Sequence, residues 1–149
     1  MSEDPYARPS TDYPFEIQIN PLKQTRVVDI QPGYGSQEIR CTLSVKNLQT
    51  ECPSDYEALS YVWGKWEDCA TISLNGIPDF PVTRNLENAL QRLRHRERTR
   101  RMWIDQLCIQ QECDCQNGGH TCEKKQQIKN IGQIFSQAQQ VIIWFGEHD

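Results

Sequence analysis

Two short apolar runs, Met102-Trp103-Ile104 and Val141-Ile142-Ile143-Trp144-Phe145, decide the fold. Each run has the length of a buried strand, and each follows a segment whose apolar residues recur at helical spacing. The first segment carries Leu86, Ala89, Leu90 and Leu93, and the second carries Ile128, Ile131, Ile134, Phe135 and Ala138. This alternation is typical of an α/β protein, so we predict a parallel sheet with right-handed crossover helices and a buried last strand.

Shorter strands are predicted upstream of these two runs. Alternating apolar residues at 15–19, 27–30 and 39–45 predict an N-terminal segment rich in β-hairpins. Asn75-Gly76 predicts a tight turn between strands at 71–74 and 77–82. The segment from Tyr56 to Trp63 is continuously apolar enough for another buried strand. Asn85 is the predicted N-cap of a helix over residues 86–97.

Composition limits the class of protein. The chain has 149 residues, 37% hydrophobic and 24% charged, which predicts one globular domain. Its net charge of -4 argues against a nucleic-acid binder. No apolar run approaches the roughly 20 residues of a membrane span, and the N-terminus lacks a signal-peptide pattern, so we expect a cytoplasmic protein. Residues 1–14, rich in proline and polar residues, predict a flexible arm before a domain over 15–149.

Candidate site residues gather near the ends of predicted strands. Asp105 follows an apolar strand, where ligands of open α/β sheets bind and where a carboxylate rarely adds stability. The alternative for Asp105 is a helix N-cap or a buried carboxylate that accepts backbone amides. Tyr61, Trp63 and Trp66 surround Gly64 and form an aromatic cluster that either stacks a flat ligand ring or belongs to the core.

A basic segment follows the predicted first helix. Between residues 92 and 101 the only acid is Glu97, so this segment carries +5 while the rest of the chain sums to -9. Its arginines are Arg92, Arg94, Arg96, Arg98, Arg100 and Arg101. Bidentate guanidinium contacts suit a phosphate-bearing ligand or an acidic partner. The alternative is the solvated end of a surface helix.

Seven cysteines are expected to be thiols in a reducing compartment, with Cys41, Cys69 and Cys108 as small core residues. A later cluster supplies four potential metal ligands within ten residues, namely Cys113, Cys115, His120 and Cys122. Thiolate and imidazole are the donors that tetrahedral zinc prefers. The one-residue gaps strain a shared tetrahedron, so the alternative is a flexible, metal-free loop with exposed thiols.

Several blocks together resemble the fungal heterokaryon incompatibility (HET) domain. Tyr56-Glu57-Ala58-Leu59-Ser60-Tyr61-Val62-Trp63-Gly64 is similar to the family's opening block, and Val82-Thr83-Arg84-Asn85-Leu86 is similar to its helix entry. A third stretch is similar to the family's central block, namely Trp103-Ile104-Asp105-Gln106-Leu107-Cys108-Ile109-Gln110-Gln111. Glu123-Lys124, Gln127 and the run from Val141 to Gly146 match later blocks. The chain departs from the pattern at Gln110, at Phe135 and in a longer loop from Gln111 to Glu123.

The resemblance implies an effector domain that triggers programmed cell death when genetically different hyphae fuse, as a form of fungal innate immunity. Such a domain acts through self-assembly or protein partners. The family is also distantly similar to TIR domains. This likeness implies a TIR-like, flavodoxin-like partial parallel sheet and, as the alternative function, an enzyme that cleaves NAD as its substrate. Fold analogy alone does not establish that chemistry.

The same resemblance assigns site roles. It implies catalytic roles for Asp105 and Glu123, and it implies ligand-binding roles, as for a nucleotide, for Tyr61, Trp63, Gly64, Cys108, Gln111 and Gln127. We expect Asp105, Trp63 and Glu123 to converge at one end of the sheet. The family pattern continues past the last strand to a further glutamate, so we expect a C-terminally truncated domain in which N-glycosidic cleavage is weak or missing.

Overall fold

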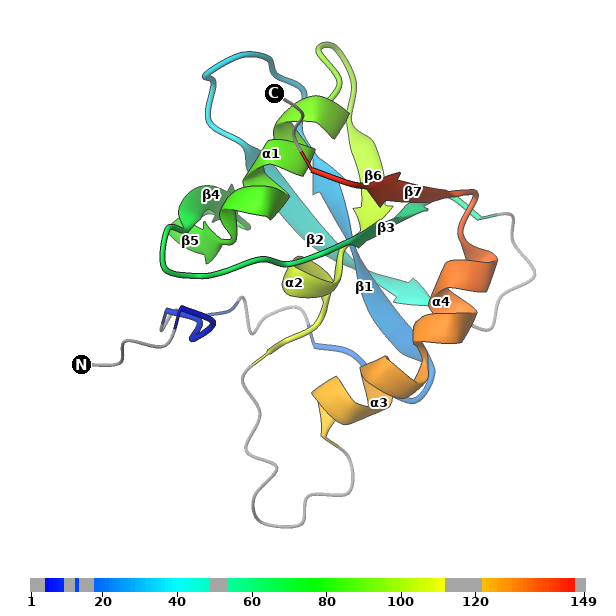
Figure 1. Cartoon of the computed structure of the whole chain (residues 1–149). Coiled ribbons are helices and arrows are strands. Elements are labelled where there is room, and N and C mark those ends of the chain that lie inside the picture. Colours follow the sequence, from blue (N-terminus) through cyan, green and yellow to red (C-terminus); the bar gives the residue numbers. More distant parts are fainter. Residues whose placement is uncertain (1–4, 10–12, 14–17, 49–53, 112–121, 147–149) are drawn as a thin grey trace.

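A computed structural model describes residues 5–9, 13, 18–48, 54–111 and 122–146 (Figure 1). Seven strands and four helices occur in these residues. In chain order they are β1 (Gln24–Ile30), β2 (Arg40–Asn47), β3 (Glu57–Tyr61), β4 (Ala70–Leu74), β5 (Ile77–Val82), α1 (Arg84–Leu93), β6 (Arg100–Trp103), α2 (Asp105–Cys108), α3 (Glu123–Lys129), α4 (Ile131–Gln137) and β7 (Val141–Trp144).

All seven strands belong to one mixed sheet in the order β5-β4-β2-β1-β6-β3-β7. The three strands β6, β3 and β7 are parallel to one another, as the alternation of helices and strands predicts. β1 pairs with both β2 and β6 in antiparallel fashion, so the N-terminal hairpin continues the parallel part of the sheet. The prediction of an α/β fold with a partly parallel sheet is confirmed, and the flavodoxin-like assignment stays a prediction.

The predicted hairpin between β4 and β5 forms at Asn75 and Gly76. Both residues have positive φ angles, 50° and 78°, which is the conformation that a two-residue hairpin turn of this kind requires. The strand predicted at 15–19 has no counterpart among its described residues, since Gln18 and Ile19 are not in a strand. Residues 15–17 lie outside the described part of the chain.

Helix α1 differs from its prediction at both ends. It begins at Arg84 and ends at Leu93, and its N-cap is Thr83, whose hydroxyl accepts from the Leu86 amide. Asn85 is inside the helix and is not the predicted N-cap. Its side chain instead donates to the Val62 carbonyl and accepts from the indole of Trp144. Leu86, Ala89 and Leu90 form the buried face of α1, in agreement with the predicted spacing.

The second predicted helix is divided into α3 and α4 at Asn130, whose amide side chain donates to the Pro21 carbonyl. Ile128 therefore lies outside the apolar face that Ile131, Ile134 and Phe135 share, and it is 52% exposed. In Figure 1 the green helix α1 lies beside β4 and β5, whereas the orange helices α3 and α4 lie on the opposite side of the molecule.

The predicted last strand exists, but it is not buried. β7 pairs with β3 on one side, and its side chains alternate between exposed and half-buried positions. Its outer side has no strand neighbour among the described residues. The apolar composition of this strand led to the prediction of burial, and its place at the edge of the sheet explains the difference.

Residues 5–9 and 13 of the N-terminal segment contact the rest of the chain, and the flexible arm over residues 1–14 stays a prediction. The Pro5 carbonyl accepts from the backbone amides of Trp66 and Glu67. Tyr13 is buried, and its hydroxyl donates to the Leu107 carbonyl at 2.6 Å. The Tyr13 ring also packs edge-on against Phe80. These contacts attach the start of the chain to three separate parts of the fold.

Trp103 lies in the centre of the core, with 1% of its surface exposed. Its indole N–H donates to the Thr25 hydroxyl at 2.9 Å, and its ring packs edge-on against Phe135 of α4 with 5.8 Å between ring centroids. This side chain therefore joins β6, β1 and α4. It also satisfies its one polar group, as a buried tryptophan must.

Replacing Trp103→Ala should destabilise the domain by about 3 to 5 kcal/mol, because the change leaves a cavity and removes the hydrogen bond from the indole to the Thr25 hydroxyl. Urea unfolding followed by circular dichroism measures the effect. Phe145→Ala is the matched control, since Phe145 is an exposed aromatic residue and its removal should change stability by less than about 0.5 kcal/mol. Equal stabilities of the two variants would contradict the central role of Trp103.

Candidate functional site

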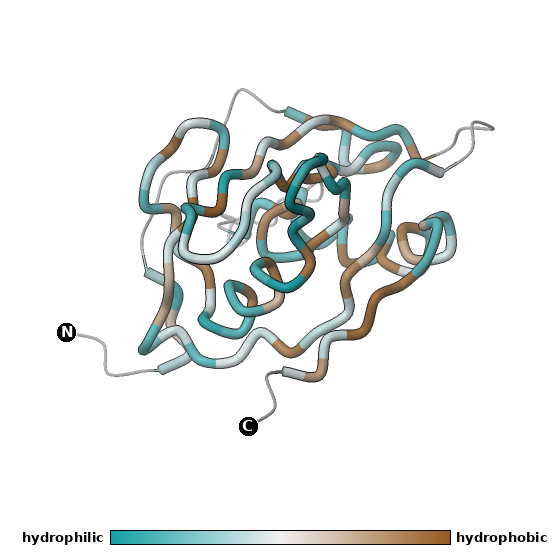
Figure 2. The backbone as a smooth tube through the Cα atoms, turned by 90° about the horizontal axis from the view of Figure 1, so that it is seen from above, coloured by the Kyte–Doolittle hydropathy of each residue, from teal (hydrophilic) through white to brown (hydrophobic). Residues whose placement is uncertain are grey.

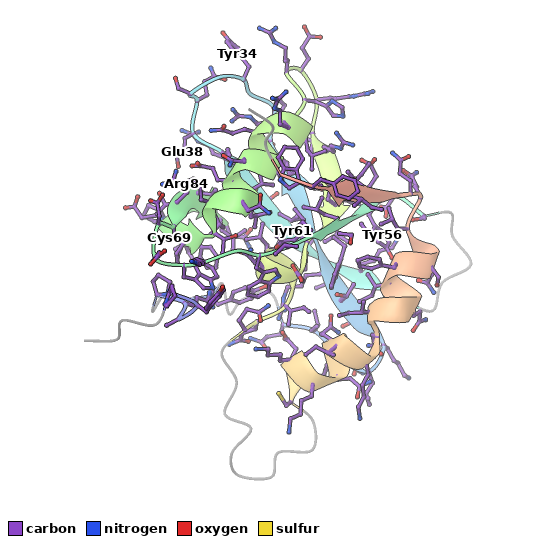
Figure 3. The ribbon with its side chains drawn as sticks, viewed as in Figure 1. Tyr34, Glu38, Tyr56, Tyr61, Cys69 and Arg84 are labelled. Carbon is purple, nitrogen blue, oxygen red and sulfur yellow. The ribbon has the colours of Figure 1, made fainter. Side chains whose placement is uncertain are left out.

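The Asp105 carboxylate is the centre of a polar network at the end of β6. Oδ1 accepts from the Tyr61 hydroxyl and from the Gln106 amide, and Oδ2 accepts from the Trp63 indole, all at 2.8 Å. The donors come from β3, the loop after it and α2, and Figure 3 shows Tyr61 in the middle of the molecule. Asp105 and Trp63 therefore meet at the carboxyl ends of adjacent parallel strands, as predicted.

The surroundings of Asp105 alter its acid-base behaviour. Burial raises the pKa of the Asp105 carboxyl above its usual range, and hydrogen bonds from Trp63 and Tyr61 act in the opposite direction. Burial, together with the nearby Asp105 charge, also raises the pKa of the Tyr61 hydroxyl well above its ordinary value. Tyr61 is thus a neutral donor to Asp105, and the pair is arranged to hold the loop after β3 in place.

Glu123 is bound to a different group. Both of its carboxylate oxygens accept from the Arg26 guanidinium, at 2.7 and 2.9 Å, and one of them also accepts from the Gln110 amide. Arg26 is 1% exposed, donates to the Cys108 carbonyl and lies over the Tyr13 ring at 5.1 Å. The negative charge of Glu123 is therefore neutralised inside the fold.

Arg26 was not identified from the sequence. The signal for it is a charged residue at a position in β1 that is flanked by Thr25 and Val27, both buried. A buried arginine in a strand needs a carboxylate partner from elsewhere in the chain. That partner, Glu123, lies 97 residues away in sequence, so the pairing cannot be read from local spacing.

Two of the predicted ligand-binding residues are core residues. Gln127 is fully buried, accepts from the Thr25 hydroxyl and donates to the Gln24 carbonyl at 2.7 Å. Cys108 is also fully buried, and burial raises the pKa of its thiol to about 12. The Gln127 side chain joins α3 to β1, and the Cys108 thiol accepts from the Ile104 amide before α2. Their binding roles remain predictions without a supporting contact.

Three of the other predicted ligand-binding residues, Trp63, Gly64 and Gln111, border a hollow of about 420 Å³ next to the Asp105 network. We call it the Trp63 hollow. Trp63 and Gly64 form one part of it, and Gln111 forms another, with its amide donating to the Asp105 carbonyl at 2.9 Å. Gly64 has a φ of 83°, so glycine allows the chain to turn there after β3. Tyr61 lies behind the hollow rather than in its lining.

The basic segment is used largely inside the fold. Arg100 pairs with Glu57 through two hydrogen bonds, and Arg101 pairs with Asp29 and Asp55. Arg94 is buried and donates to the carbonyls of Gly35, Gln37 and Glu38. Gly33 passes so close that a Cβ there would lie 2.8 Å from the Arg94 guanidinium. Three of the six arginines therefore hold loops and strands together.

The Arg100 guanidinium lowers the pKa of the Glu57 carboxyl below its ordinary value of 4.5. A lowered carboxyl pKa stabilises the fold above that ordinary value, and the contribution disappears as the pH falls through the folded-state pKa. Glu57→Gln should therefore lose stability at neutral pH and show a weaker dependence on pH below about 4.5. Thermal unfolding at several pH values measures this.

Glu67→Gln is the matched control for this pH series, because Glu67 is exposed. It should keep the acid dependence of the parent chain. If Glu57→Gln followed the same curve as the parent, the ion pair with Arg100 would contribute nothing to the acid sensitivity.

The zinc prediction stays untested. Cys113, Cys115 and His120 lie outside the described residues, and Cys122, which precedes α3, is disulfide-bonded. A sulfur atom in a disulfide is not a thiolate ligand, so reduction would have to precede zinc binding at Cys122. Within the described ranges, no cluster of three or more histidine, cysteine or acidic residues is arranged to hold a metal ion. Nor does that part of the chain contain a helix of the length and apolarity that crossing a membrane requires.

These features define a mixed α/β domain with a polar network at the carboxyl ends of its parallel strands. The chain belongs to the heterokaryon incompatibility family, because the family model described as "Heterokaryon incompatibility protein (HET)" matches residues 56–149. This confirms the resemblance on which the sequence analysis relied. The TIR-like relationship stays a prediction.

One curated relative supports the same family. The chain is 29% identical over 140 residues to "Heterokaryon incompatibility protein 6, OR allele" of Neurospora crassa. The alignment covers 85% of this chain and 19% of the relative, so the chain spans about a fifth of that protein's length. No solved structure matches the chain.

Asp105→Asn should destabilise the domain by about 1 to 3 kcal/mol, because the new amide faces the Trp63 indole with a donor in place of an acceptor. Denaturant unfolding measures the change. Asp68→Asn is the matched control, since Asp68 is exposed and its ion pair with Arg84 lies in solvent. An Asp105→Asn variant as stable as the control would show that the network does not hold the fold.

Proposed function

We propose that this chain is an effector domain of fungal heterokaryon incompatibility and that it triggers programmed cell death by assembling with further copies of itself. The family match and the name of the Neurospora crassa relative support a role in fungal incompatibility. The proposal includes a cytoplasmic location. One observation carries the mechanism: among the described residues, β7 has no strand on its outer side, and its exposed side chains are apolar.

The exposed edge consists of β7, of Val62, which follows β3, and of Phe145, which follows β7. Ile143, Val62 and Phe145 are 59%, 75% and 85% exposed. Ser60 pairs with Ile143, and the register continued by two residues places Val62 and Phe145 on the same face of the sheet. In Figure 2 the hydrophobic stretch of β7 runs along the outside of the molecule toward the C-terminus. An exposed apolar edge strand is a template for pairing with another chain.

A second copy of the same strand is the partner that suits this edge. Residues 141–146 carry no charge, so an antiparallel copy meets no like charge across the pair. The edge also lacks the lysine or proline that commonly prevents such pairing. Two-fold pairing extends the sheet from one copy into the next and places the exposed apolar side chains of both copies side by side.

The geometry gives less support to the alternative function, NAD cleavage. Catalysis of N-glycosidic cleavage needs a carboxylate that faces the substrate. The Asp105 carboxylate accepts three hydrogen bonds from the protein, and Glu123 is paired with the buried Arg26. This alternative remains a prediction from the resemblance, and it is not the basis of the proposal.

Ile143→Lys should keep the chain monomeric and abolish killing, because pairing near the two-fold axis brings two ammonium groups together. We expect dimerisation to weaken at least about tenfold. Light scattering on the purified chain measures assembly, and viability of a fungal host expressing the chain measures killing at matched protein level.

Ile128→Lys is the matched control, because Ile128 is also an isoleucine about half exposed, on α3 rather than at the edge. It should assemble and kill like the parent chain. A parent chain that stays monomeric up to about 100 μM, where even weak dimers form, would contradict assembly. Equal killing by the two variants would contradict the role of β7.

A further inference from the structure

The side chain of Asn85, near the start of α1, connects the two strands that lead into the exposed edge. Its amide nitrogen donates to the Val62 carbonyl at 2.6 Å, and its amide oxygen accepts from the Trp144 indole N–H at 3.1 Å. Val62 follows β3, and Trp144 is the last residue of β7. In Figure 1 the red end of β7 accordingly lies beside the green helix α1. Both ends of one carboxamide are therefore bonded to the exposed edge.

These two bonds reach the exposed edge from the opposite face of the sheet. Successive side chains of a strand point to opposite faces. The Trp144 indole is therefore on the α1 face, whereas the exposed side chains of Ile143 and Phe145 are on the other face, together with that of Val62. Asn85 thus holds both backbone segments that carry the three exposed apolar side chains.

The part of α1 that carries Asn85 is firmly anchored. The next residue, Leu86, is fully buried. The preceding Thr83 forms two hydrogen bonds with Gln106 of α2, since its amide donates at 3.2 Å and its hydroxyl accepts at 2.8 Å. Gln106 is itself buried. A side chain on a support of this kind is preorganised, so Asn85 can fix the position of its partners.

The outer strand β7 has few other attachments. It is four residues long and pairs with β3 alone among the described strands. Its first three residues are aliphatic, so Trp144 carries the one side-chain hydrogen-bond donor of the strand. The indole has a single N–H, and Asn85 accepts it. No other side chain of β7 can form a hydrogen bond to the rest of the fold.

We propose that Asn85 is a positioning residue for assembly, because it holds Val62 and β7 at the spacing to which a second copy binds. This inference rests on the proposed assembly through β7, and it adds a residue that lies outside the pairing surface. An edge that is already ordered loses less conformational entropy on pairing than a loose edge does. Without Asn85 the exposed edge must become ordered during pairing, which weakens association.

Asn85→Ala should weaken dimerisation by about fivefold to tenfold, measured by light scattering over a concentration series. Asn88→Ala is the matched control, because Asn88 is a half-buried residue of the same helix whose side chain makes no hydrogen bond within the described residues. The same substitution on the same helix also changes helix propensity equally. Equal dimerisation of the two variants would overturn the inference.

Trp144→Phe tests the bond from its other end, since phenylalanine keeps an aromatic ring and removes the N–H. It should weaken dimerisation of the parent chain, and it should have little further effect in the Asn85→Ala chain, because the bond is already absent there. If Trp144→Phe weakened dimerisation by the same factor in both chains, the two residues would act separately and the positioning role would be overturned.

Hydrogen exchange of the monomeric chain, followed by mass spectrometry, separates positioning from general stability. We expect β7 to exchange at least about fivefold faster in Asn85→Ala than in Asn88→Ala, while β1 exchanges alike in both. Equal acceleration of β1 and β7 would show that Asn85 stabilises the whole fold and would overturn the inference. A parent chain that does not dimerise would contradict the proposed function, and the exchange of β7 would then decide the role of Asn85 by itself.

Discussion

The ion pair between Arg26 and Glu123 is the interaction on which the rest of the structure depends. Arg26 lies in the middle of β1, where its charge is removed from water, and a buried guanidinium needs both a carboxylate and further acceptors. Glu123 supplies the carboxylate from the first residue of α3, and the Cys108 carbonyl supplies an acceptor from α2. The Tyr13 ring covers the guanidinium from the N-terminal segment. One charge therefore fixes three segments relative to the sheet.

Local sequence patterns predict the helices, strands and turns that are determined by residues close to them in the sequence. The face of α1, the turn at Asn75 and Gly76, and the strand that ends at Trp103 follow from spacing and turn chemistry. The N-cap of α1 differs because Asn85 is bonded to Val62 and Trp144 instead. The exposure of β7 differs because its composition is apolar, and position in the sheet is not encoded in composition.

The candidate site shows the same division. The sequence predicts that Asp105 and Trp63 meet, since both follow parallel strands. It does not predict that Glu123 is neutralised by Arg26, because that partner lies on a distant strand. Arg8 and Tyr6 were assigned to a flexible arm, and their place in the lining of the Trp63 hollow depends on the bonds of Pro5 to the loop after β3. Local sequence patterns therefore do not predict which residues from distant segments come together at the candidate site.

The strand order also determines when the domain can fold during synthesis. β1 occupies the middle of the sheet between β2 and β6, and the register pairs Asp29 with Arg101. One side of β1 is therefore unpaired until the ribosome has produced β6, and the Glu123 carboxylate reaches Arg26 only when α3 emerges. Pairings this distant in sequence slow folding and expose strand edges in the meantime. The core of this domain is consequently complete only after the chain has been made as far as Ile134.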